Sequence, residues 1–136
     1  DRLAAHLLDR LGTPPPTRDA RVAHELRDLL DGHVVEGLSL RAAALRLHSH
    51  HAHLVRAFSR EFDMAPHQYL TGRRVDLARR LLLDGMRAPD AATAAGFYDQ
   101  SHLSRHFKRV VGTSPGRYAR SGPACRRSSA PRTNAA

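Results

Sequence analysis

The sequence has little cysteine, no tryptophan and no long apolar run, and each of these absences excludes a class of protein. A single cysteine among 136 residues rules out a disulfide framework within the chain and a zinc site made of several of its thiolates. Aromatic residues make up only 5% of the chain, which argues against single-stranded nucleic-acid binding through stacked bases. No run of roughly 18 uncharged apolar residues and no signal-peptide pattern occurs, which favours a cytoplasmic protein without a membrane span.

Lysine is also scarce, yet the chain is strongly basic because arginine takes its place. Lys108 is the only lysine, and 22 basic against 13 acidic side chains give a formal net charge of +9 at pH 7 with histidine neutral. An excess of this size in a short chain favours a polyanionic partner, although a basic surface that only maintains solubility would give the same count.

The two ends of the chain differ in composition from its middle. Residues 1–12 carry a stripe of leucines at helical spacing, and the stiff spacer Pro14-Pro15-Pro16 follows. An isolated helix of this length is marginal in water, so we expect it to belong to a part of the protein outside this chain or to dock elsewhere. Residues 121–136 lack apolar periodicity and predict a disordered basic tail.

Between these ends, apolar residues recur with helical spacing and no alternating pattern appears, so the predicted fold class is all-α. Asp19 and Ser39 are the predicted N-caps of the first two helices. Further helices are expected to start after the break at 48–50, at Pro66, near Pro89, before Leu103 and at Pro115. The helix that ends at Gly112 is predicted to turn four side chains inward: Leu103, Phe107, Val110 and Val111.

The middle of the chain repeats itself at an offset of 49 residues. Leu54-Val55-Arg56-Ala57-Phe58 matches Leu103-Ser104-Arg105-His106-Phe107, Pro66 matches Pro115 and Tyr69 matches Tyr118. Each copy contains a short helix, a turn, a longer helix and a helix that starts with proline. The repeat predicts two tandem helix-turn-helix units, at about 38–62 and 88–111, joined by a long linker helix at about 66–83. A duplicated four-helix bundle without a DNA function would repeat in the same way.

The longer helix of each unit has a face of hydrogen-bond donors and positive charge opposite its apolar stripe. At about 100° per residue, these faces hold Ala52, His53, Arg56, Ser59 and Arg60 in the first copy and Ser101, His102, Arg105, Lys108 and Arg109 in the second. Neither helix places a carboxylate there, although Glu61 lies at the margin. Such a face on the second helix of a helix-turn-helix fits the acceptor-rich major groove of duplex DNA.

Three motifs carry a resemblance to a known family. They are Arg74-Val75-Asp76-Leu77-Ala78-Arg79-Arg80-Leu81-Leu82, the stretch from Ala95-Gly96-Phe97 through Ser101-His102-Leu103-Ser104-Arg105-His106-Phe107-Lys108-Arg109, and Gly112-Thr113-Ser114-Pro115-Gly116-Arg117-Tyr118. Residues 38–118 resemble the DNA-binding domain of the AraC/XylS family of bacterial transcription regulators. The resemblance implies a DNA-binding domain over residues 19–120, whose two reading helices enter successive major grooves roughly 34 Å apart.

The resemblance also implies site residues. The base readers carried over are Ala52, Val55 and Arg56 in the first unit and Gln100, Ser101 and Arg105 in the second. Further DNA contacts are expected from His53, Arg60, His102 and Lys108. The sequence departs from the family pattern at three positions, with Asp63 in place of glycine, His50 in place of a capping serine and Ala91 in place of a bulky aliphatic residue. We therefore expect the second unit to select its sequence more sharply than the first.

The implied function is sequence-specific binding of duplex DNA and regulation of transcription, without catalytic residues or cofactor. Operator DNA is the expected partner, with RNA polymerase as a second partner and no membrane. Many family members carry an amino-terminal domain that binds an effector or dimerises. Residues 1–18 resemble the end of such a domain plus its linker, so effector and dimer partner are expected to act through a domain outside this chain.

The histidines suggest an alternative reading. His48, His50, His51 and His53 lie close together in sequence, and His102 and His106 are four residues apart, a spacing that allows two ligands on one helix face. No third ligand of fitting spacing is evident, and surface donors near DNA explain the same residues. The alternative function is a metal-responsive or structural helical adaptor that recruits acidic partners. Cys125 is expected to be an exposed thiol in the tail.

Overall fold

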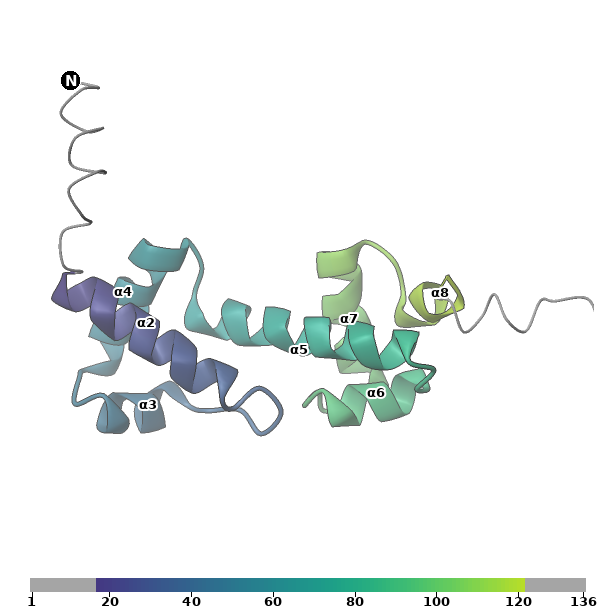
Figure 1. The fold of residues 1–136 in the computed structure, drawn as a ribbon, viewed down its shortest axis with the longest axis horizontal. Coiled ribbons are helices and arrows are strands. Elements are labelled where there is room, and N and C mark those ends of the chain that lie inside the picture. The colour runs from purple at the N-terminus through teal and green to yellow at the C-terminus, as the bar shows by residue number, and fades with distance from the viewer. Residues whose placement is uncertain (1–16, 122–136) are drawn as a thin grey trace, which may run out of the picture. The chain divides into compact units, whose positions relative to one another are not determined.

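The computed structural model describes residues 17–121, and helices joined by turns and loops make up this stretch (Figure 1). The helices are α2 (Arg18–Asp31), α3 (Leu40–Arg46), α4 (His51–Phe62), α5 (Pro66–Leu83), α6 (Ala88–Ala94), α7 (Gln100–Val111) and α8 (Pro115–Arg120). No strand occurs within residues 17–121, and the predicted all-α fold class is confirmed. The helix expected within residues 1–12, the proline spacer and the tail with Cys125 lie outside the described residues. None of the seven helices is both long and apolar enough to cross a membrane.

The chain divides into two compact units, and each contains one helix-turn-helix. The first unit comprises the residues up to Leu29 together with Ser39–Pro66, and the second comprises Leu30–Leu38 and the residues from His67 onward. Helices α3 and α4 pack together in the first unit, as α6 and α7 do in the second. The loop between α2 and α3 thus belongs to the second unit, although the helices on either side of it lie mainly in the first.

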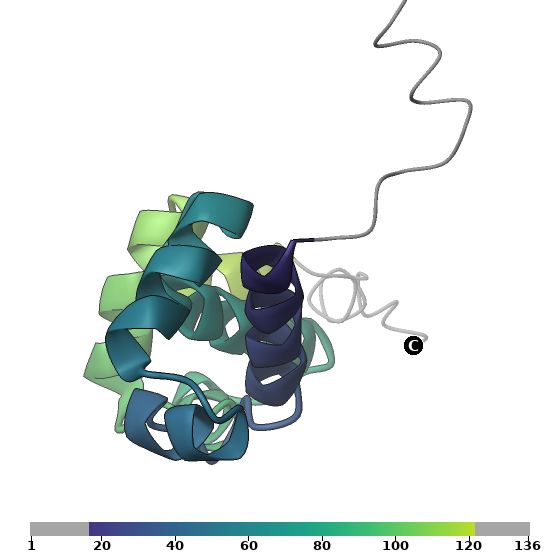
Figure 2. The same cartoon turned by 90° about the vertical axis from the view of Figure 1, so that its left-hand side faces the viewer.

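The core of the first unit lies between α2, α3 and α4. Helices α2 and α4 lie side by side in both views (Figures 1 and 2). Nε2 of His24 on α2 lies 3.0 Å from Oε1 of Glu61 on α4. The rings of Phe58 and Phe62 lie 4.7 Å apart. The buried apolar side chains of this unit are Ala23, Leu26, Ala43, Leu54, Ala57 and Phe58. Burial of one stripe of α4 leaves its opposite stripe exposed.

The core of the second unit joins α5, α6 and α7. Its buried side chains are Val75, Ala78, Leu82, Ala91, Ala92, Ala95, Phe97, Leu103 and Phe107. The ring of Tyr118 on α8 packs edge-on against Phe107, with centroids 5.4 Å apart. Ala91, which replaces the bulky aliphatic residue of the family pattern, is therefore a core residue despite its size.

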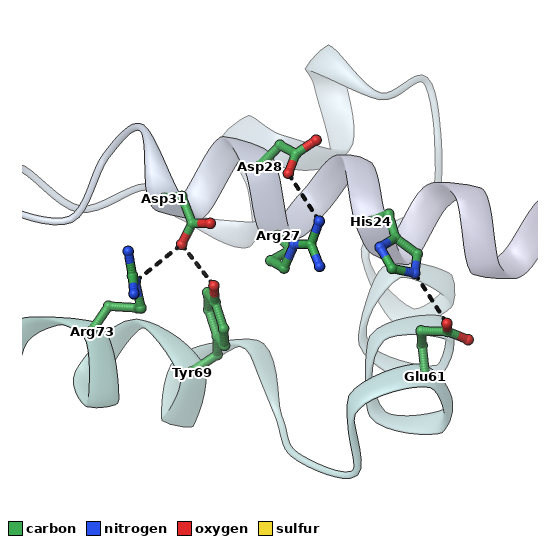
Figure 3. Close-up of polar contacts among 7 residues, drawn as sticks. All are labelled: His24, Arg27, Asp28, Asp31, Glu61, Tyr69 and Arg73. Carbon is green, nitrogen blue, oxygen red and sulfur yellow. Dashed lines mark hydrogen bonds and ion pairs between the residues drawn. The ribbon is translucent and has the colours of Figure 1, made fainter. Parts of the chain in front are cut away.

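The end of α2 is tied to α5 within the second unit, as Figure 3 shows. The hydroxyl of Tyr69 donates to Oδ1 of Asp31 over 2.7 Å, and Nε of Arg73 lies 3.3 Å from the same oxygen. In the loop that follows α2, Val34 offers its carbonyl to Nε of Arg74 over 2.7 Å. Burial lowers the pKa of Arg74. This arginine is half-buried, and its hydrogen bond to Val34 fixes the loop to α5.

The two helix-turn-helix units differ in the length of the turn. Helices α4 and α7 both have 12 residues and start 49 residues apart, whereas α3 and α6 both have 7 residues and start 48 apart. The second turn is therefore one residue longer. His48 and Gly96, equivalent at the offset of 48, both adopt positive φ, at 50° and 92°. The first turn thus places a histidine in a conformation that favours glycine.

The ends of the two longer helices differ in a similar way. Asp63 caps the end of α4 with φ of 55°, while Gly112 caps α7 with φ of 89°. The predicted departure at Asp63 therefore falls on a position with left-handed backbone, where a side chain is unfavourable.

Two local predictions are wrong. Thr17, not Asp19, caps α2: its Oγ1 accepts the Ala20 N–H over 3.2 Å, because the helix starts at Arg18 and places Asp19 inside the first turn. Val110, predicted to face inward, is 55% exposed. Helical periodicity places Val110 on the same side of α7 as Leu103, but in the last turn of the helix Val111, and not Val110, packs against the buried cluster.

Candidate nucleic-acid interface

Both longer helices begin with a side chain that accepts a backbone N–H. Nδ1 of His50 accepts from Ala52 over 3.2 Å at the start of α4, and Oδ1 of Asp99 accepts from His102 over 2.7 Å at the start of α7. An imidazole nitrogen can accept only when it carries no proton, so His50 caps α4 with its proton on Nε2. The histidine that replaces serine thus still caps the helix.

The exposed face of α4 offers one strong base-reading side chain. Arg56 is exposed and forms no ion pair within residues 17–121. Ala52 and Val55, the other two expected base readers, are partly buried and offer only small apolar surface. This composition limits direct recognition by the first unit to one guanidinium and two apolar contacts.

A carboxylate from α2 reaches the flank of this face. Oδ1 of Asp19 lies 3.4 Å from Nε2 of His53, and Oδ2 lies 3.8 Å from the guanidinium of Arg60. The structure therefore brings together two expected DNA contacts, but around an acidic group. The sequence pattern of α4 alone could not show this, because Asp19 belongs to another helix.

The exposed face of α7 carries polar and positive side chains and no acidic one. Gln100, Ser101 and Arg105, the expected base readers, are all exposed at its amino-terminal half. Lys108 and Arg109 are exposed one turn further along. None of the three cations pairs with a carboxylate in the part of the chain that the structure describes.

His102 is held in the turn that precedes α7. Its Nδ1 accepts the Tyr98 N–H over 3.3 Å, and its ring packs edge-on against Phe97 and His106, with centroids 5.3 and 4.9 Å away. His102 is partly buried, so it contributes to the shape of the turn in addition to any contact it makes with DNA. The neighbouring ring of Tyr98 is 90% exposed.

The surroundings of His106 favour its neutral form. Burial is the main cause of its lowered pKa, and electrostatic interactions with His102, Arg109, Arg105 and His67 lower the pKa further. No group of three or more histidine, cysteine or acidic side chains that could hold a metal ion occurs among residues 17–121. The pair of His102 and His106 thus gains no third ligand from the folded helices.

Comparisons with known proteins place this arrangement in a family. The pattern of a family described as "Helix-turn-helix domain" matches residues 43–121. The chain is 30% identical over 114 residues to YbfI of Bacillus subtilis, an uncharacterised HTH-type transcriptional regulator, covering 76% of this chain and 40% of that protein. It is 42% identical over 67 residues to a putative AraC-like transcription regulator of Streptomyces antibioticus, covering 48% of this chain and 22% of that protein. The chain thus spans two fifths or less of these curated relatives.

Two solved structures share the fold. The C-terminal domain of AraT, a response regulator from Geobacillus stearothermophilus, superposes with a TM-score of 0.70 at 26% identity, covering 77% of this chain and 88% of that one. The DNA-binding domain of AdpA, described as a global transcriptional factor in complex with a target DNA, superposes with a TM-score of 0.69 at 28% identity, covering 79% and 97%. The resemblance in the sequence motifs is confirmed, and the domain is that of a transcription factor, not an enzyme. The chain belongs to the AraC-type helix-turn-helix family of DNA-binding domains.

Proposed function

We propose that this chain binds a specific duplex DNA site and thereby regulates transcription, with α4 and α7 each inserted into a major groove. The observation that carries the proposal is the exposed face of α7. It presents an amide, a hydroxyl and three cations without a compensating carboxylate among the described residues. A surface kept only for solubility usually mixes both signs of charge. Support also comes from AdpA, whose similar domain was solved with a target DNA.

The exposed side chains divide into two roles in this proposal. Arg105 and Gln100 read base edges in the second unit, and Arg56 does so in the first, because arginine pairs with guanine and glutamine with adenine through two hydrogen bonds. Lys108 contacts phosphates and sets the register of the protein on the duplex. His53, Arg60, Ser101 and His102 contribute further contacts at the margins of the two helices.

We further propose that the chain is the DNA-binding part of a larger bacterial regulator. AraT is described as a response regulator whose C-terminal domain shares this fold, which supports a separate domain in front of residue 19. Effector binding and dimerisation would then take place outside residues 19–120. The regulator acts on the chromosome in the cytoplasm, and its bound form contacts RNA polymerase at the promoter. Residues 121–136 add nonspecific electrostatic attraction to DNA phosphates.

The experiment that tests DNA binding starts with selection of sites from a random duplex library. Affinity for the selected duplex and for a scrambled one is then measured by fluorescence anisotropy over a range of salt concentrations. If about six phosphates are neutralised, the affinity falls with salt at a log–log slope of about −5. A slope shallower than about −2, or equal affinity for both duplexes, contradicts the proposal. Addition of a chelator leaves binding unchanged, whereas a metal-responsive adaptor would respond to it.

A further inference from the structure

The Asp19 carboxylate on α2 connects two side chains on the DNA-facing flank of α4. Its two oxygens lie 3.4 Å from Nε2 of His53 and 3.8 Å from the guanidinium of Arg60. His53 and Arg60 are seven residues apart, so they lie on the same side of the helix two turns apart. One carboxylate therefore contacts both side chains and offsets the charge of Arg60.

These contacts are open to competition by phosphate. The side chain of Arg60 is 76% exposed and that of Asp19 is 44% exposed, so water and counterions reach the pair. Exposed ion pairs at such distances are weak. A DNA phosphate that approaches α4 can thus take over Arg60 or His53, but only at the expense of the contact with Asp19.

The second unit has no such carboxylate among the residues that the structure describes. The positions equivalent to His53 and Arg60 are His102 and Arg109. The ring of His102 accepts a backbone N–H, and Arg109 is exposed without an ion pair in residues 17–121. Among the described residues, only the first unit thus pairs these side chains of its longer helix with a carboxylate from another helix.

We infer that Asp19 is a specificity-determining residue: by pairing with Arg60 and His53, it suppresses nonspecific binding to phosphates through the first unit. The inference rests on the proposed DNA binding. Nonspecific protein–DNA binding depends almost entirely on the neutralisation of phosphates by basic side chains. A carboxylate beside those side chains therefore weakens nonspecific binding more than specific binding. In the specific complex, base contacts from Arg56 and α7 fix the protein, and Asp19 keeps the flanking side chains in one orientation. Asp19 thus raises the ratio of specific to unspecific affinity.

Asp19→Asn in the full chain tests this role, with Asp28→Asn as the matched control. Both changes remove one negative charge from α2, but within residues 17–121 Asp28 is paired only with its neighbour Arg27 (Figure 3). We expect Asp19→Asn to raise affinity for a scrambled duplex about threefold or more and to steepen the salt slope by about 0.9, one phosphate equivalent. Affinity for the selected site should change less than twofold. Asp28→Asn should change both affinities by the same small factor.

Two further variants separate this role from a general effect on folding. Asp19→Glu keeps the carboxylate and should retain the ratio of specific to unspecific affinity. In a background with His53→Gln and Arg60→Gln, Asp19→Asn should no longer change the salt slope, because the side chains it acts on are gone. The inference is overturned if Asp19→Asn and Asp28→Asn behave alike, or if the effect persists in that background. If the wild-type chain prefers no duplex, the proposed function fails together with it.

Discussion

A Cβ atom at Gly96 would lie 2.4 Å from the carbonyl oxygen of Val35, closer than a side-chain carbon can approach a backbone oxygen. The same Cβ would lie 3.0 Å from Nε of Arg74. The turn of the second helix-turn-helix is therefore built directly against the loop that follows α2, and Gly96 is required for space as well as for its φ of 92°.

Gly96→Ala should destabilise the domain strongly. We expect a loss of about 2–4 kcal/mol in the free energy of unfolding, because the clash with Val35 adds to the cost of positive φ. Gly85→Ala is the matched control: its φ is 99°, and no atom lies within 4 Å of the added Cβ. It should cost only about 1–2 kcal/mol. Urea unfolding of both variants measures the difference, and equal losses would show that the loop yields to the new side chain.

Asp63→Gly should stabilise the chain. Asp63 ends α4 with φ of 55°, a conformation that glycine adopts without steric cost. We expect a gain of about 0.5–1 kcal/mol in the free energy of unfolding. Asp63→Asn removes the same charge but retains the Cβ, so it should change stability by less. If Asn stabilises as much as Gly, relief of charge, and not of backbone strain, explains the effect.

Most of the fold could be predicted because it follows from local rules. Helical periodicity, proline at the first helical position and glycine after the last one depend only on neighbouring residues, and they predicted all seven described helices. The repeat predicted two equivalent units because Leu54 and Phe58 recur as Leu103 and Phe107, and all four side chains are buried. The offset of 48 for the shorter helices escaped detection because α3 and α6 share only alanines at this offset, Ala43 with Ala91 and Ala44 with Ala92, and both helices are rich in alanine.

What could not be predicted depends on contacts between helices. The face of α4 read as free of carboxylates because Asp19 approaches it from α2. Val110 read as buried because helical periodicity puts it on the side of Leu103, but periodicity does not show that the buried cluster contacts Val111 instead in the last turn of α7. The hydrogen bond from Arg74 to the carbonyl of Val34 could not be predicted, since sequence alone does not show which arginines the fold partly buries.

The two units should contribute unequally to specificity. Gln100→Ala with Arg105→Ala should cost more discrimination between selected and scrambled duplexes than Arg56→Ala. The double change removes two strong base readers, each worth roughly 1–3 kcal/mol against a wrong base, and Arg56→Ala removes one. Competition binding with point-mutated duplexes measures both effects. A larger loss for Arg56→Ala would reverse the ranking of the units.

The free energy of unfolding should decrease as the pH falls, because the folded chain disfavours protonation of His106. Its pKa is lowered in the folded chain, mainly by burial and then by electrostatic interactions with His102, Arg109, Arg105 and His67. The unfolded chain binds a proton near the ordinary value of about 6.5, whereas the folded chain resists protonation until a lower pH. Between these two values the unfolded state holds more protons, so the free energy of unfolding rises with pH. The contribution of His106 is fully present above about pH 6.5 and decreases as the pH falls below it.

His106→Gln should therefore flatten the dependence of stability on pH between about pH 7.5 and pH 5, measured by urea unfolding at constant ionic strength. His51→Gln removes an exposed histidine and serves as the control, which should leave the slope close to that of the wild type. The comparison is needed because the other histidines add positive charge to a chain that already carries +9. If His106→Gln leaves the dependence of the free energy of unfolding on pH unchanged, the burial of the His106 ring does not cause the loss of stability in acid. General repulsion between positive charges would then cause it.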